Sequence, residues 1–139
     1  MTKTKFVSFV LTILLCGLFA SGCNTEPVKL SGTTAMAYNI VCYIIDDSGL
    51  DARDVEVVSG NLREAGSYED PYEYNGNLKL SVDRKIRYYS VSYWSDTGEI
   101  EYRDVTDIIA EILNGKPCPY YEETDSFDIA KVNKKLKKG

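Results

Sequence analysis

Hydrophobic and polar residues follow strand-like patterns over much of the chain. Residues 38–45 are nearly all apolar and rich in β-formers, which predicts a strand buried on both faces. Apolar and polar residues alternate over 78–82, and 86–94 is also rich in β-formers, so both segments are predicted to be strands. The stretch 60–77 holds three glycines, a proline and several acids, and it predicts a long loop.

A hairpin and a helix follow these strands. The segment Ser95-Asp96-Thr97-Gly98 has turn chemistry and leads into a further alternating strand at 99–103. Apolar residues within 105–114 then recur at the spacing of one helical face, and either Asp104 or Thr106 can cap the start of this helix.

Together these elements predict one mainly β domain over residues 35–139. With a short strand at 55–58, we expect a β-sandwich of five to seven strands carrying an amphipathic helix at 105–114. The segment after Ser126 fits a C-terminal helix, although a strand is an alternative, and its lysines would be favourable at a helix C-terminus.

Part of this pattern resembles a known family. The order of its elements runs from Asp46-x-x-Gly49 through Val55 and Val57 to Asn75-Gly76-x-Leu78 and Tyr89-x-Val91-x-Tyr93. In this order residues 38–105 resemble transthyretin-like modules of the carboxypeptidase-regulatory type. Such a resemblance implies a non-catalytic β-sandwich of a kind common on exported proteins.

The start of the chain predicts export. Two lysines precede fifteen uncharged, mostly apolar residues at 6–20, an apolar run that is short for a membrane span of about 20 residues. Residues 1–22 are therefore predicted to be a signal peptide. Pro27 and small polar residues then predict a tether at 23–34.

The segment Ala20-Ser21-Gly22-Cys23 resembles the lipobox of bacterial lipoproteins. This resemblance implies cleavage before Cys23 and a lipid on its thiol, so the membrane is an expected partner through this anchor. An ordinary signal cleavage with a free Cys23 is the alternative. Asn24 is not the aspartate that retains lipoproteins at the inner membrane of enteric bacteria, which favours the outer membrane where the host has one.

Charge narrows the possible partners. Without the signal, the 117 remaining residues carry a net charge of −7, divided between an acidic body of −12 and a tail after Ala130 of +5. An acidic body argues against nucleic acid, since phosphate contacts need a basic face. The tail either solvates the terminus or touches anionic headgroups.

Two cysteines remain after Cys16 leaves with the signal and Cys23 takes the lipid. In an oxidising compartment, Cys42 and Cys118 suggest a disulfide, with two separate buried thiols as the alternative. Two thiols without histidine do not fill a zinc shell, so no metal is expected.

The residue types also limit catalysis. The chain has no histidine, which excludes Ser-His and Cys-His nucleophilic sites and most catalytic zinc sites. We therefore expect no enzyme and no cofactor, with a carboxylate-dependent glycan-acting enzyme as the alternative. That alternative would use Glu69, Asp70, Glu73, Glu122, Glu123 and Asp125. The turn aspartates at 46, 47, 51 and 54 do not match the EF-hand spacing for calcium.

Tyrosines are the candidate binding residues. Tyr68, Tyr72 and Tyr74 occur among acids in the predicted loop, where they would form either a recognition surface or packing contacts. The sequence thus predicts an exported envelope lipoprotein whose domain is a non-catalytic binding or structural module, with an envelope protein or a glycan as the possible partner.

Overall fold

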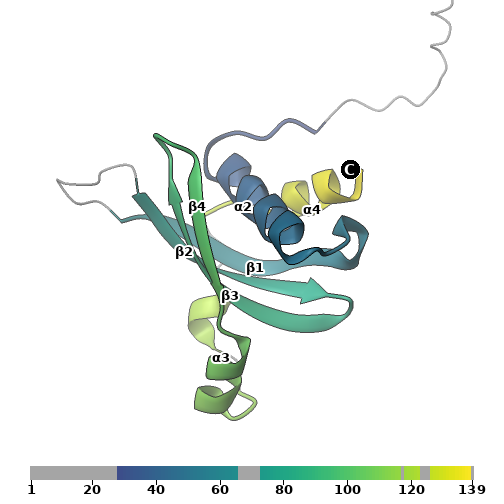
Figure 1. Cartoon of the computed structure of the whole chain (residues 1–139), viewed down its shortest axis with the longest axis vertical. Helices are drawn as coiled ribbons and strands as arrows, with labels where there is room; N and C mark the ends of the chain where they lie inside the picture. Colours follow the sequence, from purple (N-terminus) through teal and green to yellow (C-terminus); the bar gives the residue numbers. More distant parts are fainter. Residues whose placement is uncertain (1–27, 66–72, 117, 123–125, 139) are drawn as a thin grey trace, which may run out of the picture.

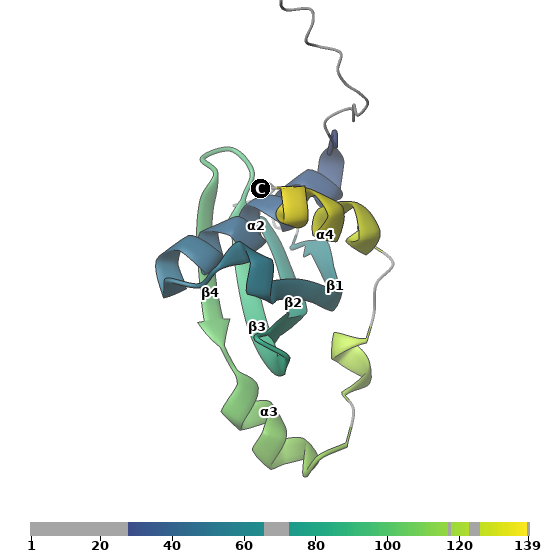
Figure 2. The same ribbon diagram turned by 90° about the vertical axis from the view of Figure 1, so that its right-hand side faces the viewer.

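A single antiparallel sheet with helices on one face forms the body of the protein. The computed structural model describes residues 28–65, 73–116, 118–122 and 126–138. The strand order is β1-β2-β3-β4, so each strand pairs with the next along the chain. Helices α2 and α4 cross the same face of the sheet, and α3 extends from one end (Figures 1 and 2). The bounds are α2 Gly32–Ser48, η3 Ala52–Asp54, β1 Val55–Glu64, β2 Glu73–Val82, β3 Lys85–Trp94, β4 Glu99–Asp104, α3 Thr106–Leu113, η4 Pro119–Tyr121 and α4 Ile129–Lys138.

Helix α2 corrects the expected strand at 38–45. Its buried residues recur every three or four positions, which is the spacing of one helical face. The nearly continuous apolar run concealed this period, because Cys42 and Tyr43 are apolar in type, yet Cys42 is only partly buried against the core and Tyr43 is exposed. The helix also begins inside the predicted tether. The buried set is Ala37, Ile40, Val41, Ile44 and Ile45.

The expected β-sandwich is also wrong, because α2 and α4 cover the face of the sheet where a second sheet would lie. Side chains from these helices and from the facing side of β1, β2 and β3 form the core. The hairpin turn at 95–98, the helix near 105–114 and the C-terminal helix are confirmed. The fold is therefore a mixed α and β arrangement, not a sandwich.

Strands β1 and β2 extend into the predicted loop at 60–77, and two glycines explain why. A Cβ on Gly76 would lie 2.0 Å from the carbonyl oxygen of Asn61, and one on Gly60 would lie 2.7 Å from Leu78 Cδ2. Both glycines are paired within the sheet. They are required for close packing between strands and not for a turn.

The C-terminal segment protects the edge strand β1. Asn133 on α4 accepts a hydrogen bond from the Val57 N–H at 2.7 Å and donates one to the Val57 carbonyl at 2.9 Å. Further along the strand, the Ser126 hydroxyl accepts from the Leu62 N–H at 2.7 Å. These side chains occupy backbone groups that an edge strand otherwise leaves open to pairing with another chain.

Candidate functional site: an exposed helix at the end of the sheet

Helix α3 presents apolar side chains that the body of the protein does not cover. None of its residues is buried. Ile108 keeps 43% of its surface exposed and Ile112 keeps 70%. The half-buried side of the helix, which includes Ile109 and Leu113, lies toward β3.

Hydrogen bonds join the start of α3 firmly to the sheet. The Val105 N–H donates to the Tyr88 carbonyl at 2.8 Å, and the Tyr88 N–H donates to the Thr106 hydroxyl at 2.9 Å. Asp104 accepts from the Thr106 backbone N–H at 2.9 Å and from its hydroxyl at 2.6 Å. Asp104, one of the two residues that the sequence offered as a cap, thus occupies the first backbone N–H of this helix from one position before the N-cap residue Val105, whose side chain makes no capping hydrogen bond.

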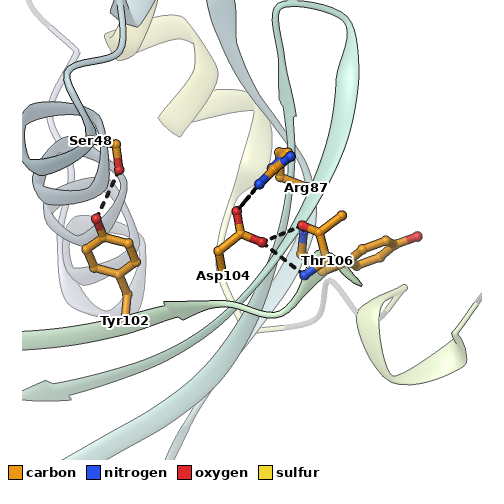
Figure 3. Close-up of polar contacts among 6 residues, drawn as sticks. Ser48, Arg87, Tyr102, Asp104 and Thr106 are labelled. Atoms are coloured by element: carbon orange, nitrogen blue, oxygen red, sulfur yellow. Dashed lines mark hydrogen bonds and ion pairs between the residues drawn. The ribbon is translucent and has the colours of Figure 1, made fainter. Parts of the chain in front are cut away.

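Arg87 on β3 completes this junction. Its Nε donates to Asp104 Oδ2 at 3.1 Å, and its Nη2 donates to the same oxygen (Figure 3). Burial raises the pKa of Asp104, but the hydrogen bonds from Thr106 and Arg87 outweigh burial and hold that pKa below its usual value. The carboxylate thus stays ionised at neutral pH and links β3, β4 and α3.

Acidic residues lie beside the exposed isoleucines. Asp107 and Glu111 are four residues apart and both exposed, so they form a ridge next to the one formed by Ile108 and Ile112. The helix ends where Asn114 adopts a left-handed conformation, with φ of 50°. We name the face formed by Ile108, Ile112, Asp107 and Glu111 the α3 face.

The structure places only part of the predicted tyrosine surface. Tyr74 lies in β2, half-buried, with Glu64 and Tyr93 as its neighbours in the sheet. Tyr68 and Tyr72 lie outside the described residues, as do Cys23 and the signal peptide. The tyrosine surface and the lipid site therefore stay predictions.

The two remaining cysteines are free thiols in the structure. Cys42 is on α2, which covers one face of the sheet. Cys118 precedes η4, and η4 lies against the opposite face, where the Ser59 hydroxyl donates to the Tyr121 carbonyl and Tyr88 packs on Tyr121. The structure thus lacks the expected disulfide, because an even number of thiols does not determine which side of a sheet each one occupies.

The structure describes two of the six acids that the sequence offered for catalysis. Glu122 forms an ion pair with Lys79 at 2.7 Å, and Glu73 begins β2 opposite Trp94. The other four lie outside the described residues. Within the described ranges, no group of three or more histidine, cysteine or acidic side chains could hold a metal ion.

No known protein family, curated protein or solved structure matches the chain. Among the helices that the structure describes, none has the length and apolar character needed to cross a membrane. The sequence predicted the apolar spacing of α3 but not the exposure of its isoleucines, because spacing alone does not show whether an apolar helix face packs on the core or lies open to solvent.

Proposed function

We propose that the protein is an exported lipoprotein of the bacterial cell envelope, attached through Cys23, and that its domain is a non-catalytic binding module. The α3 face is the proposed contact surface, and its exposed isoleucines are the observation that carries the proposal. Exposed apolar side chains that cluster on a fixed element are typical of protein contacts.

The position of α3 supports this proposal. The helix lies at the far end of the molecule from the start of α2 (Figures 1 and 2), and Cys23 precedes α2 in the sequence. In a protein anchored at Cys23, α3 would thus be presented away from the attachment point. The junction at Asp104 fixes the helix in advance, so little ordering entropy would be lost when a partner binds.

The chemistry of the α3 face favours a protein over a glycan. Ile108 and Ile112 provide aliphatic area without hydrogen-bonding groups, whereas sugars need polar partners. Asp107 and Glu111 provide negative charge along one side. The expected partner is therefore an envelope protein with an apolar recess flanked by lysine or arginine. A glycan-acting enzyme stays a prediction of the sequence alone.

Two substitutions test the anchor. Cys23→Ser should abolish lipid labelling and release the protein from the membrane fraction. Cys16→Ser is the matched control, because that cysteine leaves with the signal peptide, and it should retain both properties. Persistent labelling of the Cys23→Ser protein would contradict the anchor.

A second pair of variants tests the contact surface. Ile108→Ala with Ile112→Ala should lower recovery of a partner from solubilised native envelope at least tenfold, because hot-spot truncations each cost more than about 1 kcal/mol. Val58→Ala with Ile86→Ala is the matched control, since these residues are each 40% exposed and lie on the sheet. Equal losses in both pairs, or in neither, would contradict a specific role for α3.

A further inference from the structure

A cavity of about 330 Å³ lies between the end of α2 and the part of the sheet where β2 and β4 end and β3 begins. One part of its wall is apolar, formed by Leu50, Val82 and the ring of Tyr89, which is only 4% exposed. Lys85 and Arg87 occupy alternate positions of β3 and so point to the same side, into this cavity. The volume is at the lower end of the range for small-molecule pockets, about 300–1,000 Å³.

Hydrogen-bond donors predominate in this cavity. Asp104 is its one carboxylate, and both Asp104 oxygens already accept hydrogen bonds, one from Arg87 and the other from Thr106. The Ser48 hydroxyl is already engaged with the Tyr102 hydroxyl at 2.9 Å (Figure 3). Because the Tyr102 hydroxyl donates its hydrogen to Asp47 at 2.6 Å, Ser48 is the donor to Tyr102.

Positive charge in the cavity is not fully balanced. Asp104 offsets Arg87, whereas no ion pair joins Lys85 to any residue that the structure describes. Arg87 has five N–H donors and gives two of them to Asp104, which leaves donors for a ligand. The site therefore carries a net charge of about +1 beside an apolar wall.

We propose that this cavity binds a small organic carboxylate with a short apolar body, its carboxylate held by Lys85 and Arg87 and its body against Leu50 and Val82. A cation would meet only a carboxylate that is already saturated. Inorganic phosphate would satisfy the donors but leave the apolar wall in contact with water. The cavity shares no residue with the α3 face, so loss of ligand binding here and loss of partner binding there are distinguishable outcomes.

Amide chemical shifts of the mature chain carrying Cys23→Ser give a direct test, because that change alters no described residue. Hexanoate should produce saturable shifts at Lys85, Arg87 and Tyr89. Hexanol, which is neutral, and hexylamine, which is cationic, should bind at least tenfold more weakly. N-acetyl-leucine, which carries the same carboxylate as a peptide C-terminus, should also bind, and its neutral amide should bind at least tenfold more weakly.

Variants separate this site from general attraction of anions. Lys85→Ala should weaken hexanoate binding about tenfold, because it removes the unpaired cation. Lys134→Ala, at an exposed lysine on α4, should leave binding unchanged. Equal affinity for hexanoate and hexanol, shifts that do not saturate, or full binding by Lys85→Ala would each overturn the proposal.

Discussion

Helices α3 and α4 are built alike and end in opposite environments. An aspartate shortly before each helix accepts a backbone N–H from its first turn: Asp104, two residues before α3, and Asp128, directly before α4. Each has a pair of aliphatic residues four positions apart. In α4 this pair, Val132 and Leu136, is 0% and 3% exposed, whereas in α3 the corresponding pair is 43% and 70% exposed.

The difference shows what the same sequence pattern can mean. Helix α4 packs its apolar side chains into the core, and its lysines lie on its other sides. Core packing therefore fully explains its pattern of apolar and polar residues. Helix α3 has the same spacing, but part of its apolar side lies beyond the core and beside acids. Apolar surface that folding does not use is available for binding.

The largest expected effect on stability is at the buried aliphatic pair of α4. Leu136→Ala should lower the free energy of unfolding by about 2–5 kcal/mol, because it removes buried methyl groups and leaves a cavity. Urea denaturation measures this change. A loss below about 1 kcal/mol would mean that α4 is not part of the cooperative core.

Replacing the two aspartates should affect different parts of the protein. Asp128→Ala removes the side chain that accepts the Lys131 N–H at the start of α4, a change that typically costs about 0.5–2 kcal/mol, and Asp104→Ala removes the link from α3 to Arg87 and Thr106. The first should lower global stability, because α4 belongs to the core. The second should mainly speed amide hydrogen exchange within α3. Faster exchange across the whole protein in Asp104→Ala would show that α3 is not an independent element.

Low pH should destabilise α3, because it protonates the Asp104 carboxylate. The pKa of Asp104 in the folded protein is lowered from 3.8, so its stabilising contribution is complete above that value and is lost as pH falls through the folded pKa. The protection factors of the α3 amides, which are exchange rates corrected for the intrinsic effect of pH, should therefore fall below about pH 4. Asp104→Asn should remove this pH dependence, and an unchanged pH profile in that variant would contradict the assignment.

The smallest expected effect on stability is at the exposed isoleucine. Ile112→Ala should change the free energy of unfolding by less than about 0.5 kcal/mol, because the side chain makes few contacts to lose and alanine favours helices. Urea denaturation beside Leu136→Ala measures it. A loss comparable to that of Leu136→Ala would place Ile112 in the core and remove the basis for the α3 face.

Local signals predicted part of this architecture. The turn at 95–98, the amphipathic helix near 105–114 and the C-terminal helix could be predicted because each depends on neighbouring residues. Helix α2 could not be separated from a strand, since a run of apolar residues contains both periods. Gly60 and Gly76 looked like loop residues because the close approach that needs them involves residues distant in sequence.

The candidate site could be predicted only in outline. Spacing identified the apolar face of α3, but its exposure depends on how far the sheet and the other helices extend. Arg87 gave no signal in the sequence, because its partner Asp104 lies 17 residues away and meets it only through the pairing of β3 with β4. The expected disulfide between Cys42 and Cys118 is absent from the structure for a similar reason, since the number of cysteines does not show where the fold places them.

Site-specific photo-crosslinking in the whole protein, expressed in its native cells, tests most directly whether the α3 face contacts a partner. A photoreactive residue at position 112 should give one discrete adduct in the native envelope. The adduct should disappear when Asp107→Lys and Glu111→Lys reverse the acidic ridge, and position 86 should not give it. No adduct at 112, or the same adduct from position 86, would contradict a binding role for α3.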